Sequence, residues 1–294
     1  MRNVIEISHL TRDYGNHKGI FDININVKQG EVFGFLGPNG SGKTTTIRHL
    51  MGFIKAKEGC CTINQLDCFK DADQIQDNLG YLAGEIAFLD DLTGKRLIEF
   101  VASLKGIKNK SKIQELTEMF ELDTKSKISK MSKGMKQKVG IVCAFMSDPQ
   151  VIILDEPTSG LDPLMQNRFI DLLLAEKKRG KTIFMSSHIF EEVEKTCDRV
   201  AIIRNGEIVA IDKIDNLKQK KKKAYAVTLK TKEAADAFAA SGYHILERVD
   251  NTVSISINGE ISGFIKDLGD YDVKDLDIHT QSLEDIFLHY YGGQ

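Results

Sequence analysis

The segment Gly37-Pro38-Asn39-Gly40-Ser41-Gly42-Lys43-Thr44 constrains the fold of this chain more than any other. It follows a short apolar run of strand character at residues 31–36 and precedes a helix-compatible run at residues 45–51. The spacing G-x-x-x-x-G-K-[ST] needs glycines so that consecutive backbone N–H groups can turn inward onto phosphate oxygens. The alternative is a glycine-rich turn that binds nothing, but the flanking strand and helix favour a nucleotide-binding loop.

Each part of this loop has a predicted role. Lys43 is expected to reach the β- and γ-phosphates, and Thr44 is expected to place its hydroxyl on Mg²⁺. The positive end of the following helix adds a favourable field for an anion. The predicted nucleotide contacts in this segment are Gly37, Pro38, Asn39, Gly40, Ser41, Gly42, Lys43, Thr44 and Thr45.

Composition argues against several other classes. The net charge is −2 over 294 residues, so no global positive field draws the chain to nucleic acid. The five cysteines contain no C-x-x-C pair, which fits a reducing cytoplasm. No apolar segment approaches the roughly 20 residues needed to cross a bilayer, so we expect any membrane role to come through a partner.

The periodicity along the chain predicts an α/β fold. Short strands fill the first 30 residues, and strands then alternate with helices, which places ligand sites at the carboxyl ends of the strands. Apolar residues recur at helical spacing from residue 93 to residue 120, and we assign a helical insert to about 85–147. Asn205-Gly206 predicts a type I′ hairpin between two strands.

The chain is expected to divide near a lysine-rich segment. We assign residues 1–215 to the first domain, 216–223 to a linker and 224–294 to a small α+β domain with an accessory or dimerisation role. The lysine run is interpreted as solvated, with attraction to an anionic membrane surface as the alternative. In the small domain we predict strands at 224–230 and 252–257, a helix at 232–241 and a closing helix at 285–290.

A second chemical signal follows an apolar strand at residues 151–154. The strand delivers Asp155 and Glu156 to its carboxyl end, where a phosphate loop from a neighbouring strand would also lie. Asp155 is placed to hold Mg²⁺, and Glu156 is placed to polarise a water toward the γ-phosphorus. An Asp-Glu pair is weak alone and persuasive downstream of a phosphate loop.

The ordered set of motifs resembles the nucleotide-binding subunits of ABC transporters, which have a P-loop NTPase fold with an N-terminal antiparallel β-subdomain. The set comprises 37–44, the segment Met131-Ser132-Lys133-Gly134-Met135-Lys136-Gln137, the run from Leu154 to Asp162, and Ser186-Ser187-His188. The likeness covers residues 4–211. The tail at 281–288 resembles the C-terminal extension of bacterial exporter-type subunits whose membrane protein is encoded separately.

The resemblance implies roles for five further residues. Ser132 and Gly134 match the segment that caps the γ-phosphate held by Lys43 of a second chain, although an ordinary serine helix cap would look the same. Asp162 matches a loop that couples the two sites across the dimer. His188 matches the switch histidine at the γ-phosphate, and Tyr14 matches the aromatic residue that stacks on adenine.

Three positions depart from the family pattern. The family usually has glycine at Lys133 and glutamine at Met135. Gly84 stands where a glutamine normally contacts Mg²⁺ and the attacking water, and its side chain cannot coordinate anything. We hypothesise that Glu85 reaches the metal from the next position, as a carboxylate in place of an amide oxygen.

The leading hypothesis is a Mg²⁺-dependent ATPase subunit that powers export through a separate integral membrane permease. Two ATP molecules would lie between the subunits of a homodimer or pseudo-homodimer at the cytoplasmic face of the cell membrane, with no nucleic acid bound. The alternatives are a soluble ABC ATPase that acts on ribosomes or DNA, and a regulatory module that binds ATP without turnover.

Overall fold

The computed structural model describes residues 2–89, 91–219, 223–257 and 261–280. The chain divides into two compact units, Met1–Ile214 and Asp215–Gln294. The tail at 281–288 and the closing helix predicted at 285–290 lie outside the described residues.

An antiparallel sheet begins the first unit, as the sequence predicted. Its strand order is β2-β1-β4-β5, and every pairing in it is antiparallel. The strands are β1 (Asn3–Asp13), β2 (Gly19–Lys28), β4 (Glu58–Ile63) and β5 (Leu66–Asp67). From Ile23 to Lys28 alternate residues of β2 are buried, which matches one face packed on the core and one in solvent.

The central sheet has the order β10-β9-β3-β8-β7-β6, with parallel pairing from β9 through β6. Its strands are β3 (Val32–Leu36), β6 (Leu79–Leu82), β7 (Val151–Asp155), β8 (Thr182–Ser187), β9 (Arg199–Arg204) and β10 (Glu207–Lys213). Every residue of β3, β7 and β8 is buried, as expected for strands with both faces covered.

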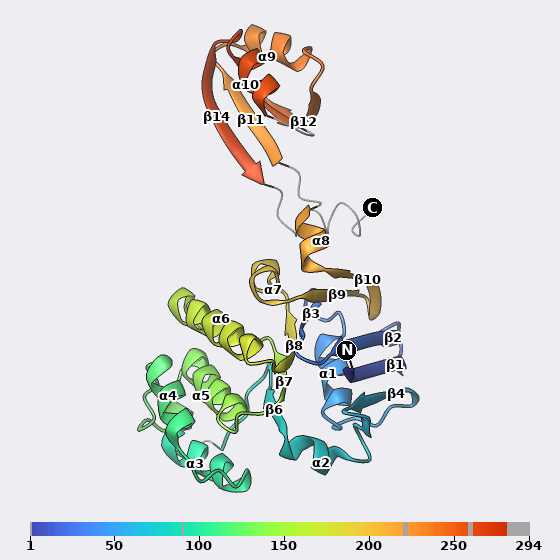
Figure 1. Cartoon of the computed structure of the whole chain (residues 1–294), viewed down its shortest axis with the longest axis vertical. Helices are drawn as coiled ribbons and strands as arrows, with labels where there is room; N and C mark the ends of the chain where they lie inside the picture. The colour runs from blue at the N-terminus through green and yellow to red at the C-terminus, as the bar shows by residue number, and fades with distance from the viewer. Residues whose placement is uncertain (1, 90, 220–222, 258–260, 281–294) are drawn as a thin grey trace. The chain divides into compact units, whose positions relative to one another are not determined.

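Helices of this unit surround the sheet, and Figure 1 shows α3, α4 and α5 grouped away from β1 and β2. They are α1 (Lys43–Leu50), α2 (Ala72–Asp77), α3 (Gly94–Leu104), α4 (Ser111–Met119), the 3₁₀ turn η1 (Ile128–Lys130), α5 (Lys133–Phe145), α6 (Pro163–Lys178) and α7 (Phe190–Thr196). Within the described ranges, none is both long enough and apolar enough to cross a membrane.

The core beneath the site is aromatic. The rings of Phe33 and Phe184 lie 5.9 Å apart, and those of Phe35 and Phe184 lie 5.5 Å apart. All three side chains are fully buried, and each burial contributes about 1.5–3 kcal/mol. These contacts join β3 to β8 and so fix the two strands whose ends carry the nucleotide loop and His188.

The hairpin between β9 and β10 turns at Asn205 and Gly206, with φ of 51° and 82°. Two successive positive φ values define the predicted type I′ turn, so this prediction is confirmed. Helix α8 (Ile214–Gln219) spans the boundary between the two units and covers the first residues of the linker predicted at 216–223, and its apolar Ile214 and Leu217 are buried.

Between residues 223 and 280, the described part of the second unit forms a four-stranded antiparallel sheet of order β12-β13-β11-β14 and two helices. Its elements are β11 (Lys223–Leu229), α9 (Lys232–Ala239), β12 (His244–Val249), β13 (Thr252–Ser256), α10 (Ser262–Leu268) and β14 (Val273–Thr280). The sequence predicted β11, α9 and β13 but missed the other three. The six residues of β12 are all exposed, so no buried-face pattern marks that strand.

Candidate active site

The candidate site lies where three neighbouring parallel strands end. Strand β8 lies between β3 and β7, with Leu36 paired to Ser187 and Asp155 paired to Ser186. The nucleotide loop follows β3, His188 follows β8, and Glu156 follows β7. The fold therefore gathers three segments that are more than 30 residues apart in the chain.

The backbone of the loop leaves room for a ligand. A side-chain carbon on Gly40 would meet no atom within 4 Å, and the φ of this residue is +79°. A carbon on Gly37 would instead lie 2.3 Å from the Ile203 carbonyl oxygen, so this position requires glycine. The buried Ser41 hydroxyl has no hydrogen-bond partner among the residues that the structure describes. A phosphate oxygen would supply that partner.

Lys43 points across the loop toward a carboxylate. Its Nζ donates to the carbonyl oxygens of Gly37 at 2.7 Å and Pro38 at 3.1 Å. The same nitrogen lies 3.1 Å from Oε1 of Glu156, and its side chain is only 5% exposed. A buried ammonium with three oxygen partners is positioned to hold phosphate oxygens as well.

Asp155 is held by two hydroxyl groups. Thr44 Oγ1 donates to Oδ2 at 2.8 Å, and Ser186 Oγ donates to Oδ1 at 2.5 Å. Burial raises the pKa of Asp155, and the two hydrogen bonds oppose part of that rise. Thr44 and Asp155 present oxygen atoms side by side, which is the donor type that Mg²⁺ requires.

Glu156 has a left-handed backbone, with φ of 46°. Its N–H donates to the carbonyl oxygen and the hydroxyl of Ser186, at 3.2 and 3.0 Å, and these bonds hold the conformation. Its Oε2 lies 3.0 Å from Nδ1 of His188. The structure thus brings together Lys43, Asp155, Glu156 and His188 as the sequence predicted.

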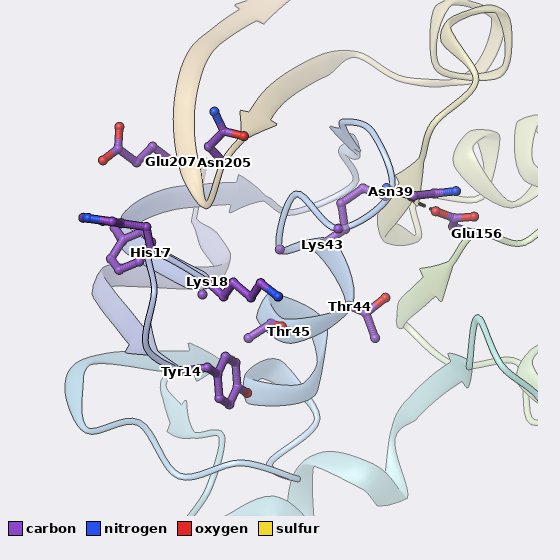
Figure 2. Close-up of a pocket in the computed structure, with 14 residues that line it drawn as sticks. Tyr14, His17, Lys18, Asn39, Lys43, Thr44, Thr45, Glu156, Asn205 and Glu207 are labelled. Carbon is purple, nitrogen blue, oxygen red and sulfur yellow. Dashed lines mark ion pairs between the residues drawn. The ribbon is translucent and has the colours of Figure 1, made fainter.

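The site opens into a pocket of about 970 Å³, shown in Figure 2, where Lys43 and Glu156 face one another across their ion pair. Tyr14 lies on another side of it, 53% exposed, with the Arg12 guanidinium carbon 5.1 Å from its ring centre. Sequence reasoning missed several lining residues: His17, Lys18, Phe21, Asn205 and Glu207. Of these residues, only Asn205 belongs to a recognisable sequence motif, and that motif predicted a hairpin turn, not a ligand contact.

The β9–β10 hairpin reaches the pocket because its tip is tied to the loop. Gly206 N–H donates to the Ser41 carbonyl oxygen at 3.0 Å, and Phe21 N–H donates to the Gly206 carbonyl oxygen at 2.8 Å. The turn therefore links the nucleotide loop to β2.

Ser132, Gly134 and Asp162 are not among the described residues that line this pocket. Ser132 Oγ accepts from Met135 N–H at 3.2 Å and caps α5, and Asp162 Oδ1 accepts from Met165 N–H at 3.0 Å and caps α6. Both side chains thus have a local structural role in the single chain. A side-chain carbon on Gly134 would lie 2.5 Å from the Gly160 carbonyl oxygen, so the two segments pack closely.

Comparison with known proteins decides the family. The sequence model of the ABC transporter family matches residues 20–159. The chain is 35% identical to the bacitracin transport ATP-binding protein BcrA of Bacillus licheniformis, over all of this chain and 99% of the relative. It is 32% identical to the uncharacterised ABC transporter ATP-binding protein YhcH of Bacillus subtilis, over 99% and 97%. The chain belongs to the ABC transporter ATP-binding proteins.

Solved structures agree with this assignment. An ATP-binding subunit of an ABC transporter superposes with a TM-score of 0.67 at 30% identity, over 74% of this chain and 92% of the other. The dimeric ABC transporter cassette MJ0796, at 24% identity and a TM-score of 0.64, shares the fold over 71% and 98%. The chain is thus an ABC ATPase with the P-loop NTPase fold that its motifs indicated.

The departure from the ABC pattern at Gly84 lies directly beside Asp155. A side-chain carbon on Gly84 would be 3.1 Å from the Asp155 carboxyl carbon. The exposed Glu85 lines a cavity of about 630 Å³ together with Thr44 and Asp155. Across the described ranges, no group of three or more His, Cys, Asp or Glu side chains is placed to hold a metal. Mg²⁺ usually keeps several waters, so one or two carboxylates suffice.

Proposed function

We propose that this ABC ATPase is the energising subunit of an exporter and works as a pair of cassettes beneath an integral membrane permease. The observation that carries the proposal is the Lys43–Glu156–His188 contact at the ends of β3, β7 and β8, beside Asp155. Likeness over the whole chain to a protein named for bacitracin transport supports a transport role.

In this proposal each residue of the site has its own role in ATP hydrolysis. Lys43 and the loop N–H groups hold the triphosphate, and Tyr14 stacks on the base. Thr44 and Asp155, with Glu85 as a further candidate, hold Mg²⁺, which neutralises charge on the phosphates when bound. Glu156 Oε takes a proton from water as the water oxygen bonds to the γ-phosphorus and the bond to ADP breaks. His188 orients Glu156 through its 3.0 Å contact.

A second chain completes each site in this proposal. Ser132 caps α5 and Gly134 lies in its first turn, where backbone N–H groups and the helix dipole suit a γ-phosphate. They lie outside the pocket of their own chain, which fits a role toward a partner's nucleotide. Asp162 then links the two sites. The dimeric relative MJ0796 supports this pairing.

The permease contact is proposed for the cavity beside Gly84, at the cytoplasmic face of the membrane. Phe53 is 56% exposed at this cavity and packs edge-on against Tyr81, with ring centres 5.8 Å apart. Phe53 lines the same cavity as Thr44 and Asp155, so a permease bound to this exposed ring would be coupled to the nucleotide site. Export, rather than import, rests on the resemblance of the tail at 281–288 to exporter-type subunits, and the name of the bacitracin relative supports transport.

The second unit, residues 224–294 in our assignment, is proposed as an accessory or dimerisation domain. The apolar side chains of Val249 on β12 and Ile278 on β14 are each 57% exposed, which suits contact with another chain. Sedimentation of the Ile278→Glu variant tests this role: weaker self-association supports it, and unchanged self-association contradicts it.

Purification of the tagged chain from soluble and detergent-solubilised membrane fractions tests the transport role. Recovery with one integral membrane protein, lost when Phe53 is replaced by Glu, supports the exporter. Salt-sensitive recovery with ribosomes or DNA and no membrane protein would favour the soluble alternative. ATP binding with no turnover by the recovered complex would favour the regulatory module.

A further inference from the structure

A buried carboxylate next to the site has no part in the steps above. Glu192 lies in α7 and is only 6% exposed. One of its oxygens accepts from the Thr158 hydroxyl, and the other accepts from the Ser187 hydroxyl at 3.0 Å. Both hydroxyl-bearing residues are also buried, at 4% and 2% exposure. The carboxylate therefore joins two segments in the interior.

The two segments carry the groups that act on the nucleotide. Ser187 ends β8 and directly precedes His188. Thr158 lies two residues after Glu156, in a turn where Ser159 N–H donates to the Glu156 carbonyl oxygen at 3.1 Å. Nδ1 of His188 lies 3.0 Å from Oε2 of Glu156. Through Ser187 and Thr158, Glu192 therefore connects the two segments that carry this pair.

The opposite side of the turn is held by α5. Gln137 is 1% exposed, and its Nε2 donates to the Pro157 carbonyl oxygen at 2.7 Å. The turn thus lies between a donor from α5 and an acceptor from α7. Contacts from two helices therefore restrict the turn that follows Glu156.

The charge state of Glu192 suits this role. An ionised carboxylate only accepts hydrogen bonds, and both hydroxyl groups donate to it. Burial raises the pKa of Glu192, and the bonds from Thr158 and Ser187 oppose the rise. The titratable groups facing it are His188, which favours the charged form, and Glu156, which disfavours it.

We infer that Glu192 is a positioning residue for hydrolysis, which sets the placement of Glu156 against His188 by joining Thr158 to Ser187. The inference rests on the proposed roles of Glu156 and His188. Small misplacement of a reacting group can cost about 100-fold in rate. We therefore expect Glu192→Ala to lower kcat by about 10- to 100-fold while the KM for ATP stays within about threefold.

If Glu192 had only a structural role, its replacement would change stability and not kcat. Its loss would lower the melting temperature and the amount of folded protein, but the folded molecules would turn over ATP at the normal kcat. The matched control is Glu191→Gln, because Glu191 lies in the same helix with its side chain 83% exposed. This variant is expected to keep both its kcat and its melting temperature.

The experiment measures steady-state ATPase kinetics and folded fraction for Glu192→Ala, Glu192→Gln, Thr158→Val and their combinations. Glutamine can accept from one hydroxyl and donate to the other, so Glu192→Gln should recover part of the kcat that alanine loses. Thr158→Val should lose little more activity when Glu192 is already alanine, because the pair acts through one contact.

Four results separate the possible failures. A normal kcat per folded molecule in Glu192→Ala would overturn the inference, and so would a normal kcat in Thr158→Val, even if Glu192→Ala does not fold. Fully additive losses in the double variant would also overturn it. Unimpaired turnover by Glu156→Gln would instead refute the proposed active site.

Discussion

Glu156→Gln is the substitution that should separate hydrolysis from binding. The amide keeps the size of the side chain, whose oxygens lie 3.1 Å from Lys43 Nζ and 3.0 Å from His188 Nδ1. It cannot take a proton from the attacking water. Loss of a general base lowers kcat by about 10²–10⁴-fold, which corresponds to about 3–5.5 kcal/mol.

Binding should change in the opposite direction. Lys43 keeps its bonds to the carbonyl oxygens of Gly37 and Pro38, so the loop stays formed. The carboxylate that competes with a triphosphate for this ammonium is gone. A charged hydrogen bond exceeds a neutral one by about 1 kcal/mol, so we expect the Kd for ATP to fall by about fivefold.

The assay combines single-turnover hydrolysis, calorimetric ATP binding and gel filtration with Mg²⁺ and ATP. The expected result is slow hydrolysis, tight ATP binding and an ATP-dependent dimer. Glu191→Gln serves as the control, since the side chain of Glu191 is exposed and pairs with the exposed Lys195. Turnover within about threefold of the wild type, with only monomers present, would refute the assignment of Glu156.

Three further substitutions test the surrounding structure. Gly84→Ala places a carbon 3.1 Å from the Asp155 carboxyl carbon, so overpacking of about 1–3 kcal/mol should lower the Tm, and an unchanged Tm would contradict the packing. Tyr14→Ala should weaken ATP binding by about 1–3 kcal/mol in calorimetry while Tyr14→Phe keeps it, and equal affinities would exclude stacking. Partial burial raises the pKa of Asp148, but bonds from Arg179 and Lys181 outweigh this and hold it below 3.8. Ionised Asp148 therefore stabilises the folded protein at pH values above its pKa in the unfolded chain, and this stabilisation is lost as the pH falls through its pKa in the folded protein. Asp148→Asn should lower the free energy of unfolding at pH 7 and leave it unchanged in acid. Denaturant titrations showing the same difference at both pH values would contradict this.

Local chemistry made much of the site predictable. The glycines of the nucleotide loop, Lys43 and Thr44 act within eight consecutive residues, so their spacing alone indicates phosphate binding. Asn205-Gly206 needs two left-handed residues, and the structure has both. Asp155 ends an apolar strand that is fully buried, as its composition suggested, and Glu156 follows it.

Long-range placement could not be predicted in the same way. The position of β8 between β3 and β7 depends on sheet order, which no local pattern encodes. The pocket residues His17 and Glu207 are ordinary polar residues until the fold brings them to the loop. The contact between Thr158 and Glu192 joins residues 34 positions apart.

Mixing two inactive variants tests the central claim, a site shared between two chains, most directly. Lys43→Ala removes the ammonium group that is proposed to bind the triphosphate. Gly134→Asp places a side chain where even one carbon would lie 2.5 Å from the Gly160 carbonyl oxygen. Each variant alone should be inactive. If each site combines Lys43 of one chain with Gly134 of the other, the mixture should regain up to about one quarter of wild-type ATPase activity. No recovery in a mixture that does form dimers would contradict the shared site.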